Sequence, residues 1–515
     1  MLLRNSKMSW VLILSAVVLV WSSSANASSL DSALIEAVKK ADLLSIDELL
    51  EQGVDVNSAG PDGTTALHWA AHDGNIEILV RLIQAGGNIT AFNRYGIAPI
   101  WLAAQNGHAD IIETFLRLGV APNTPRNDSG ETVLMIAARG GHAGVLQRLI
   151  AYGADVNATD SIRSQTALMW AAAEGHQSAV QILSEAGSDL EARSMTGLTA
   201  LMFAIRSGDI NVTREILKQG ADLRTTAPDG TTMLVLAIIN AHWELAAFLL
   251  EKGADPNVDD SVHGRPLHVL AWMRRAENRG LSAWLPRISS GNIDSIELAE
   301  ALIVHGAEVN DVLDWENPTQ SPKHMALSMF PGTGYSGATP FFIASKNCDI
   351  ELMKFLVKNG ADPTIQTNQQ VSPLLAAAGV GYAIGESPGT PEEALEAVQL
   401  LQELGNDVEA IAGALVPRTG ASSGGIGSWD GASALQGAVI RGAEGLARWL
   451  IEEGVPLDHK MKSDETALDL AEGSSLGITY HVQPELAQII REAMIEQGLS
   501  APNASEREHG DETKY

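Results

Sequence analysis

The chain has 515 residues, 45% of them hydrophobic, and its 34 basic and 63 acidic side chains give a formal net charge of −29 at pH 7. This length accommodates about three or four ordinary domains or one long array of repeats, and so acidic a surface argues against nucleic acid as a partner. The one cysteine, Cys348, rules out a disulfide within the chain, so the fold must be stabilised by packing.

Residues 1–27 have the pattern of a secretory signal peptide. Arg4 and Lys7 supply the positive start, SWVLILSAVVLVW is the apolar segment, and Ala25-Asn26-Ala27 offers small residues around a cleavage site. The apolar segment is about 13 residues long, shorter than the roughly 20 needed to span a bilayer. We therefore expect a periplasmic or secreted protein with no membrane span after cleavage. An uncleaved membrane anchor is the alternative.

One six-residue motif recurs along the rest of the chain, at first with steps of 33 or 34 residues. Its twelve copies are SALIEA at 32, TALHWA at 65, APIWLA at 98, TVLMIA at 132, TALMWA at 166, TALMFA at 199, TMLVLA at 232, RPLHVL at 265, TPFFIA at 339, SPLLAA at 372, SALQGA at 433 and TALDLA at 466. A period of this length indicates a stack of small supersecondary units.

Each position of the motif has a physical role. Ser or Thr opens ten of the twelve copies, as a helix N-cap should, and four have proline next, where its missing N–H costs nothing. The third residue is Leu, Ile or Phe throughout and the sixth is Ala in all copies but one, which predicts a buried face. A glycine 21 residues after the first position, such as Gly53 or Gly86, is expected to end a second helix in the left-handed conformation.

These residues carry a family resemblance. TALH at 65–68, RPLH at 265–268, the Gly-His pairs at 107–108, 141–142 and 175–176, and GADVN at 153–157 resemble ankyrin repeats over roughly residues 30–498. Together with the signal peptide, the chain resembles exported bacterial ankyrin-repeat proteins. The resemblance implies an all-α solenoid of about twelve helix-turn-helix repeats, whose hairpins and inner helices form a concave surface that binds other proteins.

The repeats are regular at first and become interrupted later. Residues 28–264 keep the short spacing, whereas residues 265–498 have long segments inserted within the repeats that begin at 265 and 372, and in the turns that follow them. Residues 499–515 form a polar tail that we expect to be disordered. The predicted organisation is thus a signal peptide, regular repeats, repeats with inserted loops, and a tail.

Several motifs that could indicate catalysis or metal binding have simpler explanations. GESPG at 385–389 matches a hydrolase nucleophile pattern, but the residue after Ser387 is proline, which has no N–H for an oxyanion hole. His108, His142 and His176 recur once per repeat, too far apart to share one metal, and the resemblance implies that they brace turns by hydrogen bonding. Cys348 stands where other repeats have a turn glycine. We expect no catalytic residue, metal site or cofactor.

The inserted loops hold the strongest candidates for partner binding. Arg and Trp are enriched among interface residues that carry binding energy, and here they gather in an otherwise acidic chain. The predicted partner-binding residues are Arg274, Arg275, Arg279, Trp284, Arg287, Trp315, Phe330 and Tyr335. The alternative is that these loops pack onto the solenoid and only thicken it.

The sequence therefore predicts an exported scaffold that binds a protein partner, of unknown identity, through its concave face and C-terminal loops. One alternative is a structural subunit that stabilises an exported enzyme or envelope complex. A less favoured one is an enzyme with a pocket between the inserts at 273–337 and 379–431, where His305 or His324 would face a carboxylate.

Overall fold

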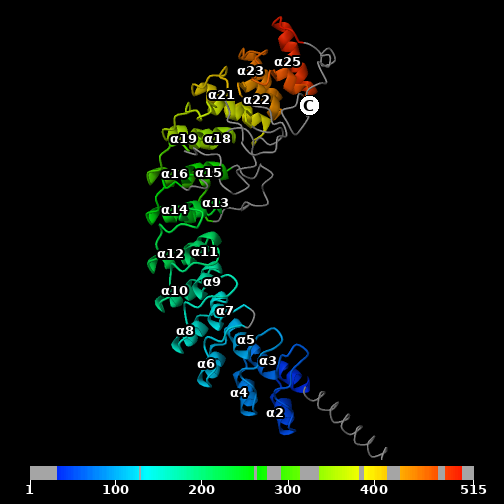
Figure 1. Ribbon diagram of the computed structural model, residues 1–515, viewed down its shortest axis with the longest axis vertical. Helices are drawn as coiled ribbons and strands as arrows, with labels where there is room; N and C mark the ends of the chain where they lie inside the picture. The colour runs from blue at the N-terminus through cyan, green and yellow to red at the C-terminus, as the bar shows by residue number, and fades with distance from the viewer. Residues whose placement is uncertain are drawn as a thin grey trace, which may run out of the picture. The chain divides into compact units, whose positions relative to one another are not determined.

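The computed structural model describes residues 32–126, 129–259, 264–274, 291–313, 336–381, 388–413, 430–473 and 482–501. The chain divides into two compact units, Met1–Leu223 and Arg224–Tyr515, here named the N-terminal unit and the C-terminal unit. The boundary at Leu223 falls among the repeats that the sequence treats as regular. Each unit is a stack of helix pairs (Figure 1).

The N-terminal unit holds six of these pairs among its described residues. They are a helix at 32–39 with α2 (Leu43–Glu51), α3 (Ala66–Asp73) with α4 (Ile76–Gln84), α5 (Pro99–Gln105) with α6 (Ala109–Arg117), α7 (Val133–Arg139) with α8 (Ala143–Ala151), α9 (Ala167–Ala173) with α10 (Gln177–Glu185), and α11 (Ala200–Ser207) with α12 (Ile210–Lys218).

The C-terminal unit adds six more pairs among its own described residues. They are α13 (Met233–Ile239) with α14 (Trp243–Glu251), α15 (Pro266–Met273) with α16 (Ser295–Val304), α18 (Pro340–Lys346) with α19 (Ile350–Lys358), α20 (Pro373–Ala378) with α21 (Pro391–Glu403), α22 (Ala434–Arg441) with α23 (Glu444–Glu452), and α24 (Ala467–Ala471) with α25 (Pro484–Glu496). The predicted all-α fold of about twelve repeats is confirmed.

The first helix of a repeat begins where its opening motif predicts. The hydroxyls of Thr132, Thr166 and Thr339 accept hydrogen bonds from the backbone N–H three residues on, at 3.1 to 3.3 Å. Prolines at the next position start α5, α15, α18 and α20. These caps satisfy N–H groups that a helix leaves without an intrahelical partner.

Each second helix ends at the predicted glycine. Gly153, for example, has φ +85°, and a Cβ added there would meet nothing within 4 Å. Glycine is therefore needed at this turn for its backbone conformation and not for lack of space.

Within each unit, first helices stack on first helices, and in the N-terminal unit second helices likewise stack on second helices. In the N-terminal unit α3, α5, α7, α9 and α11 are in contact in that order, as are α4, α6, α8, α10 and α12. The alanine at the sixth motif position is fully buried in α3, α5, α7, α9 and α11, so these helices approach one another closely. The apolar core is continuous along each stack because every repeat buries its face against the next.

Asparagines join neighbouring repeats beyond the second helices. The Asn157 side chain donates to the Gly187 carbonyl at 3.3 Å and accepts from the Asp189 amide at 2.8 Å, and both partners belong to the following repeat. The same pair of bonds recurs at Asn57, Asn123, Asn257 and Asn310. We name this row of asparagines the asparagine ladder. The GADVN motif thus supplies a connection between repeats.

Histidines brace the turns between the two helices, as expected. The Nε2 of His108, His142 and His176 bonds to the carbonyl of His72, Gln105 and Arg139, respectively, at 2.8 to 2.9 Å. Each carbonyl belongs to the preceding repeat, so the brace also holds one repeat to another. The prediction of a hydrogen-bonding role is confirmed.

The predicted signal peptide at 1–27, most of the tail at 499–515 and Ser387 lie outside the described residues. No helix in the described ranges is long and apolar enough to cross a membrane.

Candidate functional site: the inner face of the N-terminal unit

The first helices of the N-terminal unit expose part of an apolar row. Counting the N-cap residue as the first position, the fifth is Trp69 in α3, Leu102 in α5, Trp170 in α9 and Phe203 in α11. All four side chains are half-buried, unlike the alanine that follows each of them in the core. We name these residues, the eighth-position residues and the hairpin tips that precede the helices the inner face.

Cations of one repeat lie over indole rings of the next. The Arg139 guanidinium, at the eighth position of α7, lies 5.4 Å from the ring centroid of Trp170. In the same register, Lys39 Nζ lies 4.5 Å from the ring centroid of Trp69. Such stacking holds a cation in place and leaves the outward part of its charge available.

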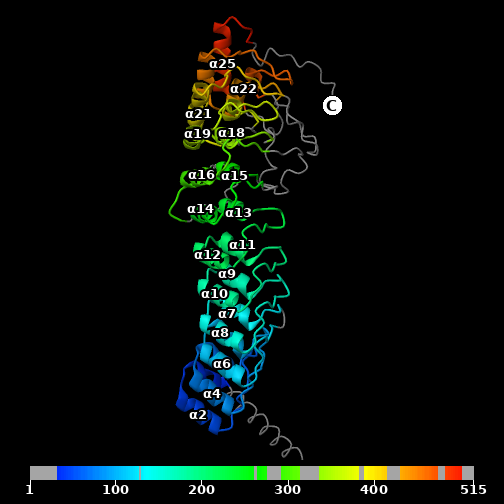
Figure 2. The ribbon, with the colours of Figure 1, turned by 90° about the vertical axis from the view of Figure 1, so that its left-hand side faces the viewer.

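The hairpins between repeats carry exposed apolar side chains at their tips. Phe92 is 43% exposed, Tyr95 62%, Ile162 56% and Met195 71%. In the N-terminal unit the hairpins project on the side of the first helices, away from the second helices (Figure 2). These exposed apolar side chains lie at the tips of three hairpins, where a bound partner could cover them.

Backbone hydrogen bonds fix neighbouring hairpin tips to one another. The Arg94 amide donates to the Asp62 carbonyl at 2.9 Å, and the Met195 amide donates to the Arg163 carbonyl at 2.7 Å. The exposed side chains are therefore presented by a connected row of turns. A preorganised surface loses less conformational entropy on binding.

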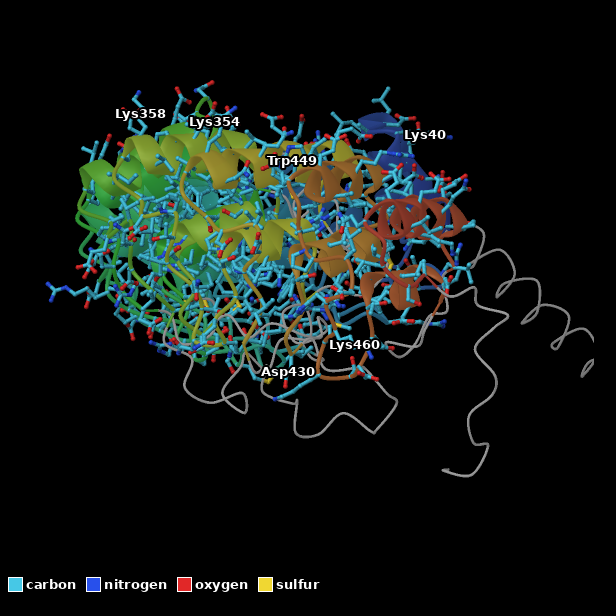
Figure 3. All side chains as sticks on the ribbon, turned by 90° about the horizontal axis from the view of Figure 1, so that it is seen from above. Lys40, Lys354, Lys358, Asp430, Trp449 and Lys460 are labelled. Atoms are coloured by element: carbon cyan, nitrogen blue, oxygen red, sulfur yellow. The ribbon has the colours of Figure 1, made fainter. Side chains whose placement is uncertain are left out.

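The corresponding face is closed in part of the C-terminal unit. Ile343 at the fifth position of α18 is 1% exposed, Lys346 at the eighth is 2%, and Ala376 at the fifth position of α20 is 0%. In this unit, Lys354 and Lys358 of α19 project on the opposite side from Asp430 and Lys460 of the hairpins (Figure 3). Among the described residues, the open row of first-helix side chains lies in the N-terminal unit.

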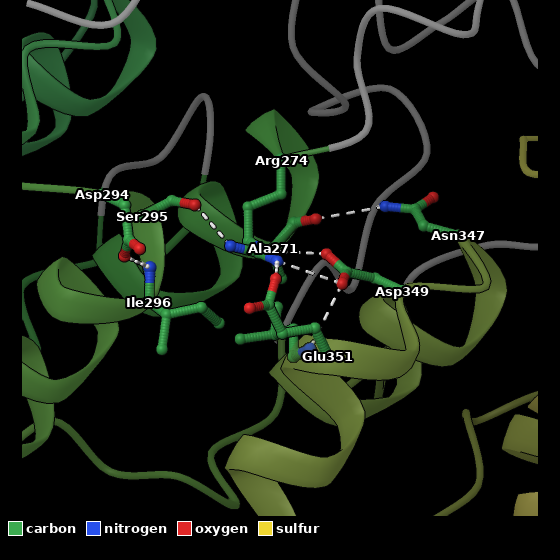
Figure 4. Close-up of polar contacts among 9 residues, drawn as sticks. Ala271, Arg274, Asp294, Ser295, Ile296, Asn347, Asp349 and Glu351 are labelled. Atoms are coloured by element: carbon green, nitrogen blue, oxygen red, sulfur yellow. Dashed lines mark hydrogen bonds and ion pairs between the residues drawn. The ribbon is translucent and has the colours of Figure 1, made fainter.

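Arg274, the first of the predicted partner-binding residues, makes an ionic network within the C-terminal unit (Figure 4). Its Nε donates to Asp349 Oδ2 at 2.7 Å, its Nη2 donates to Glu351 Oε2 at 2.7 Å, and its Nη1 bonds to the Ser295 hydroxyl. The Arg274 side chain is only 10% exposed. Burial opposes its charge, but Asp349 and Glu351 outweigh burial and raise the pKa of Arg274. Its observed contacts are thus internal.

The network joins three elements. Arg274 follows α15, Ser295 begins α16, and Asp349 caps α19 by accepting from the Leu352 amide at 3.2 Å. The Asn347 side chain also donates to the Ala271 carbonyl at 3.1 Å. Asp349 has the position in its repeat that His108 has in the N-terminal unit. Its ion pair with Arg274 and the Asn347 bond therefore link the turn to the preceding repeat, as the histidine brace does.

The other predicted partner-binding residues, Arg275, Arg279, Trp284, Arg287, Trp315, Phe330 and Tyr335, lie outside the described residues. Their role stays a prediction.

The residues considered for catalysis or metal binding are found in structural settings. His305 is exposed at the end of α16, and its Nδ1–H donates to the Ala301 carbonyl at 2.8 Å. Cys348 is fully buried at φ +52° in the turn between α18 and α19, the glycine-like position that the sequence indicates. Among the described ranges there is no group of three or more His, Cys, Asp or Glu side chains placed to hold a metal. His324 lies outside those ranges.

The residues of the inner face differ from the partner-binding residues that the sequence predicts. Trp69, Trp170 and Arg139 of the first helices are absent from that prediction, and so are Tyr95, Ile162 and Met195 of the hairpin tips. The sequence does carry a signal for this face. A cation at the eighth position of one repeat is followed by a tryptophan at the fifth position of the next, as in Arg139 and Trp170. A regular repeat draws attention to buried positions, whereas binding uses the positions that the fold leaves variable.

Comparisons with known proteins agree with the fold. A family model described as ankyrin repeats in three copies matches residues 34–126, 100–194 and 189–260, and an ankyrin-repeat model matches 336–368. The Notch-regulated ankyrin repeat-containing protein A of Danio rerio is 41% identical over 81 residues, which are 15% of this chain and 72% of that protein. The Homo sapiens protein of the same description is 40% identical over 81 residues, 15% of this chain and 71% of that protein. A potassium channel of Oryza sativa subsp. japonica is 41% identical over 75 residues, 15% of this chain and 8% of the channel.

Proposed function

Because this chain belongs to the ankyrin-repeat family, we propose that it is a non-catalytic scaffold which binds another protein through the inner face of its N-terminal unit. Ankyrin repeats support a protein-binding role in general. The proposal assigns that role here to the half-buried aromatic row and the hairpin tips.

The observation that carries the proposal is the half-buried Trp170 beneath Arg139 on a row of stacked repeats. Trp, Tyr and Arg are the side chains that most often dominate binding energy at protein interfaces. The inner face presents all three types, and the hairpin tips place Tyr95 beside the same row. Many modest contacts spread along a solenoid, with a few strong anchors, suit a protein ligand.

The test is affinity capture from the native host with three versions of the protein. Wild type, the inner-face variant Trp170→Ala with Arg139→Glu, and the outer-face control Arg117→Glu would be compared at equal helicity by circular dichroism. Arg117 is a suitable control because it lies on α6, a second helix, with its side chain 70% exposed. A stoichiometric partner retained by the control and lost by the inner-face variant supports the proposal. Retention by all three would assign binding to another surface.

Export is a separate part of the proposal. It is supported by the charge, length and small-residue pattern of residues 1–27 and by the resemblance to exported bacterial proteins. The expected mature protein begins at Ser28, so intact mass and N-terminal sequencing of protein from the exported fraction would show loss of residues 1–27. A full-length chain in the cytoplasmic fraction would contradict export.

The inserted loops are proposed as a second contact area. This rests on the concentration of Arg and aromatic residues in segments 275–290 and 314–335. Replacing Arg275, Arg279 and Trp284 with Ala should weaken capture while leaving Arg274 and its network intact. Unchanged capture by a folded variant would restrict binding to the inner face.

A further inference from the structure

Most carboxylates near the inner face are already engaged by contacts within the chain. Asp62 accepts from the Thr64 amide at 3.0 Å and from its hydroxyl at 2.8 Å. Asp160 is buried and accepts from three backbone amides of its own turn. Glu131 forms an ion pair with Arg126, N to O 3.7 Å. The oxygens of these carboxylates are thus committed to contacts within the chain, although the carboxylates keep their negative charge.

Two arginines of the inner face are exposed. Arg94 and Arg163 both lie at hairpin tips. The exposed carboxylates nearby are Asp73, which bonds to the His72 ring at 2.7 Å, Glu36, which pairs with Lys39 at 2.9 Å, and Glu174. Exposed arginines on this face can pair with carboxylates of a ligand of complementary charge.

Arg139 is the best prepared of these cations. Its guanidinium stacks on Trp170, and its backbone carbonyl is held by His176 Nε2 at 2.8 Å. A planar guanidinium with its orientation already restricted loses little entropy when it forms paired hydrogen bonds to a carboxylate. Lys39 over Trp69 is a weaker equivalent, because it already pairs with Glu36 at 2.9 Å.

The spacing of the two stacked pairs suggests the length of a ligand. Trp69 and Trp170 lie three repeats apart, and packed helices are 8 to 10 Å apart, so the two indoles are separated by about 24 to 30 Å. An extended chain rises about 3.3 Å per residue, so about seven to nine residues cover this distance. Leu102 lies between the pairs and Phe203 beyond them, which calls for apolar side chains in the ligand.

Resting on the proposed function, we infer that the inner face takes an extended acidic segment of the partner protein, which also carries apolar residues and places one carboxylate against Arg139 above Trp170.

The experiment is selection from a phage-displayed library of random linear peptides on the full mature protein. Wild type should select peptides enriched in Asp or Glu together with apolar residues, and the Arg139→Glu variant should select peptides that have lost the acidic residue or replaced it with Lys or Arg. A fluorescein-labelled peptide selected on wild type should bind at least about tenfold more weakly to Arg139→Gln by fluorescence anisotropy, and equally well to Arg117→Glu.

Three results would overturn the inference. They are selection of basic or uncharged peptides on wild type, binding that does not change in Arg139→Gln, and no peptide selected above an unrelated control protein. None of these would remove the proposed function, because partner capture tests Trp170 and Arg139 together with an intact folded partner and requires no acidic segment. If peptide selection fails and the inner-face variant also captures the partner as well as wild type does, both the inference and the proposed function are overturned.

Discussion

The fourth position of the repeat motif shows how one residue couples stability to pH. His268 is fully buried, and its Nε2 lies 3.1 Å from both the Asp311 and the Ala338 carbonyl oxygens. Burial is the main cause that lowers the pKa of His268, to about 4. His68 has the same position and donates to Ile97 at 3.0 Å, and burial lowers its pKa as well. Both imidazoles are therefore neutral hydrogen-bond donors near pH 7.

In another repeat of the C-terminal unit, a glutamine takes the motif position that His268 has. Gln436 occupies the same motif position, and its Nε2 donates to the His459 and Glu465 carbonyls at 3.2 and 3.0 Å. Glutamine can therefore make the bridging contacts without a titratable group.

His268→Gln should reduce the acid sensitivity of the C-terminal unit. The unfolded histidine titrates near 6.5 and the folded one near 4, so between these values the unfolded state binds more protons and stability falls as the pH is lowered. The total loss is about 3 kcal/mol at about 1.4 kcal/mol per unit of pKa. Urea unfolding at pH 7 and pH 5 should show a smaller loss for the variant than for wild type. The exposed-residue control His305→Gln should behave as wild type, and an identical loss in all three would contradict the assignment.

At the scale of elements, the asparagine ladder joins repeats in both units, and each unit adds contacts of its own. Histidine braces connect repeats in the N-terminal unit, whereas in the C-terminal unit α15, α16 and α19 meet at the buried Arg274 network. An ion pair at this depth is favourable only while both partners are present, because each charge has been taken out of water.

Arg274→Ala should strongly destabilise the C-terminal unit. It leaves the Asp349 carboxylate, 2% exposed, without its guanidinium, and breaking a buried pair in this way costs about 3 to 5 kcal/mol. The matched control is Lys354→Ala, which removes an ion pair to Glu396 whose side chains are 60% and 58% exposed and should cost at most about 1 kcal/mol. Urea denaturation of both variants measures the difference. Equal, small losses would show that the network contributes little.

Asn157→Ala should weaken the connection between two repeats of the N-terminal unit. It removes the bonds to the Gly187 carbonyl and from the Asp189 amide, and at a net value of about 0.5 to 1.5 kcal/mol each the expected loss is about 1 to 3 kcal/mol. Asn106→Ala is the comparison, because the Asn106 side chain bonds to Leu102 within its own helix. Thermal unfolding of the two variants measures the difference. If their melting temperatures are equal, the asparagine ladder does not stabilise the connection between repeats.

At the scale of the whole molecule, the chain consists of two compact units with different inner surfaces. Stability in a repeat array is close to a sum of repeat terms and nearest-neighbour terms. Arg274→Ala should therefore raise amide hydrogen–deuterium exchange in α15, α16, α18 and α19 while leaving α3 to α10 protected as in wild type. Mass spectrometry of peptic fragments makes this comparison. Uniformly faster exchange along the chain would indicate a single cooperative unit.

The fold could be predicted almost completely from sequence, and the candidate site only in part. Caps such as Thr166 and turn glycines such as Gly153 have local causes, so their motif positions are enough to place the helices. Arg274 could not be assigned from its neighbours, because Asp349 and Glu351 reach it from a later repeat across an insert. The proposed binding role of Arg139 likewise depends on its contact with Trp170, which belongs to the next repeat.

Because Cys348 is buried, its rate of alkylation can report how often the surrounding structure opens. The chain has one thiol, and it is shielded in the turn between α18 and α19. An alkylating reagent can reach it only when this turn opens, so the rate at which the intact mass shifts by one adduct counts opening events in unmodified protein. Ligands and solution conditions that act on the C-terminal unit can therefore be ranked by alkylation rate, with no label or substitution introduced.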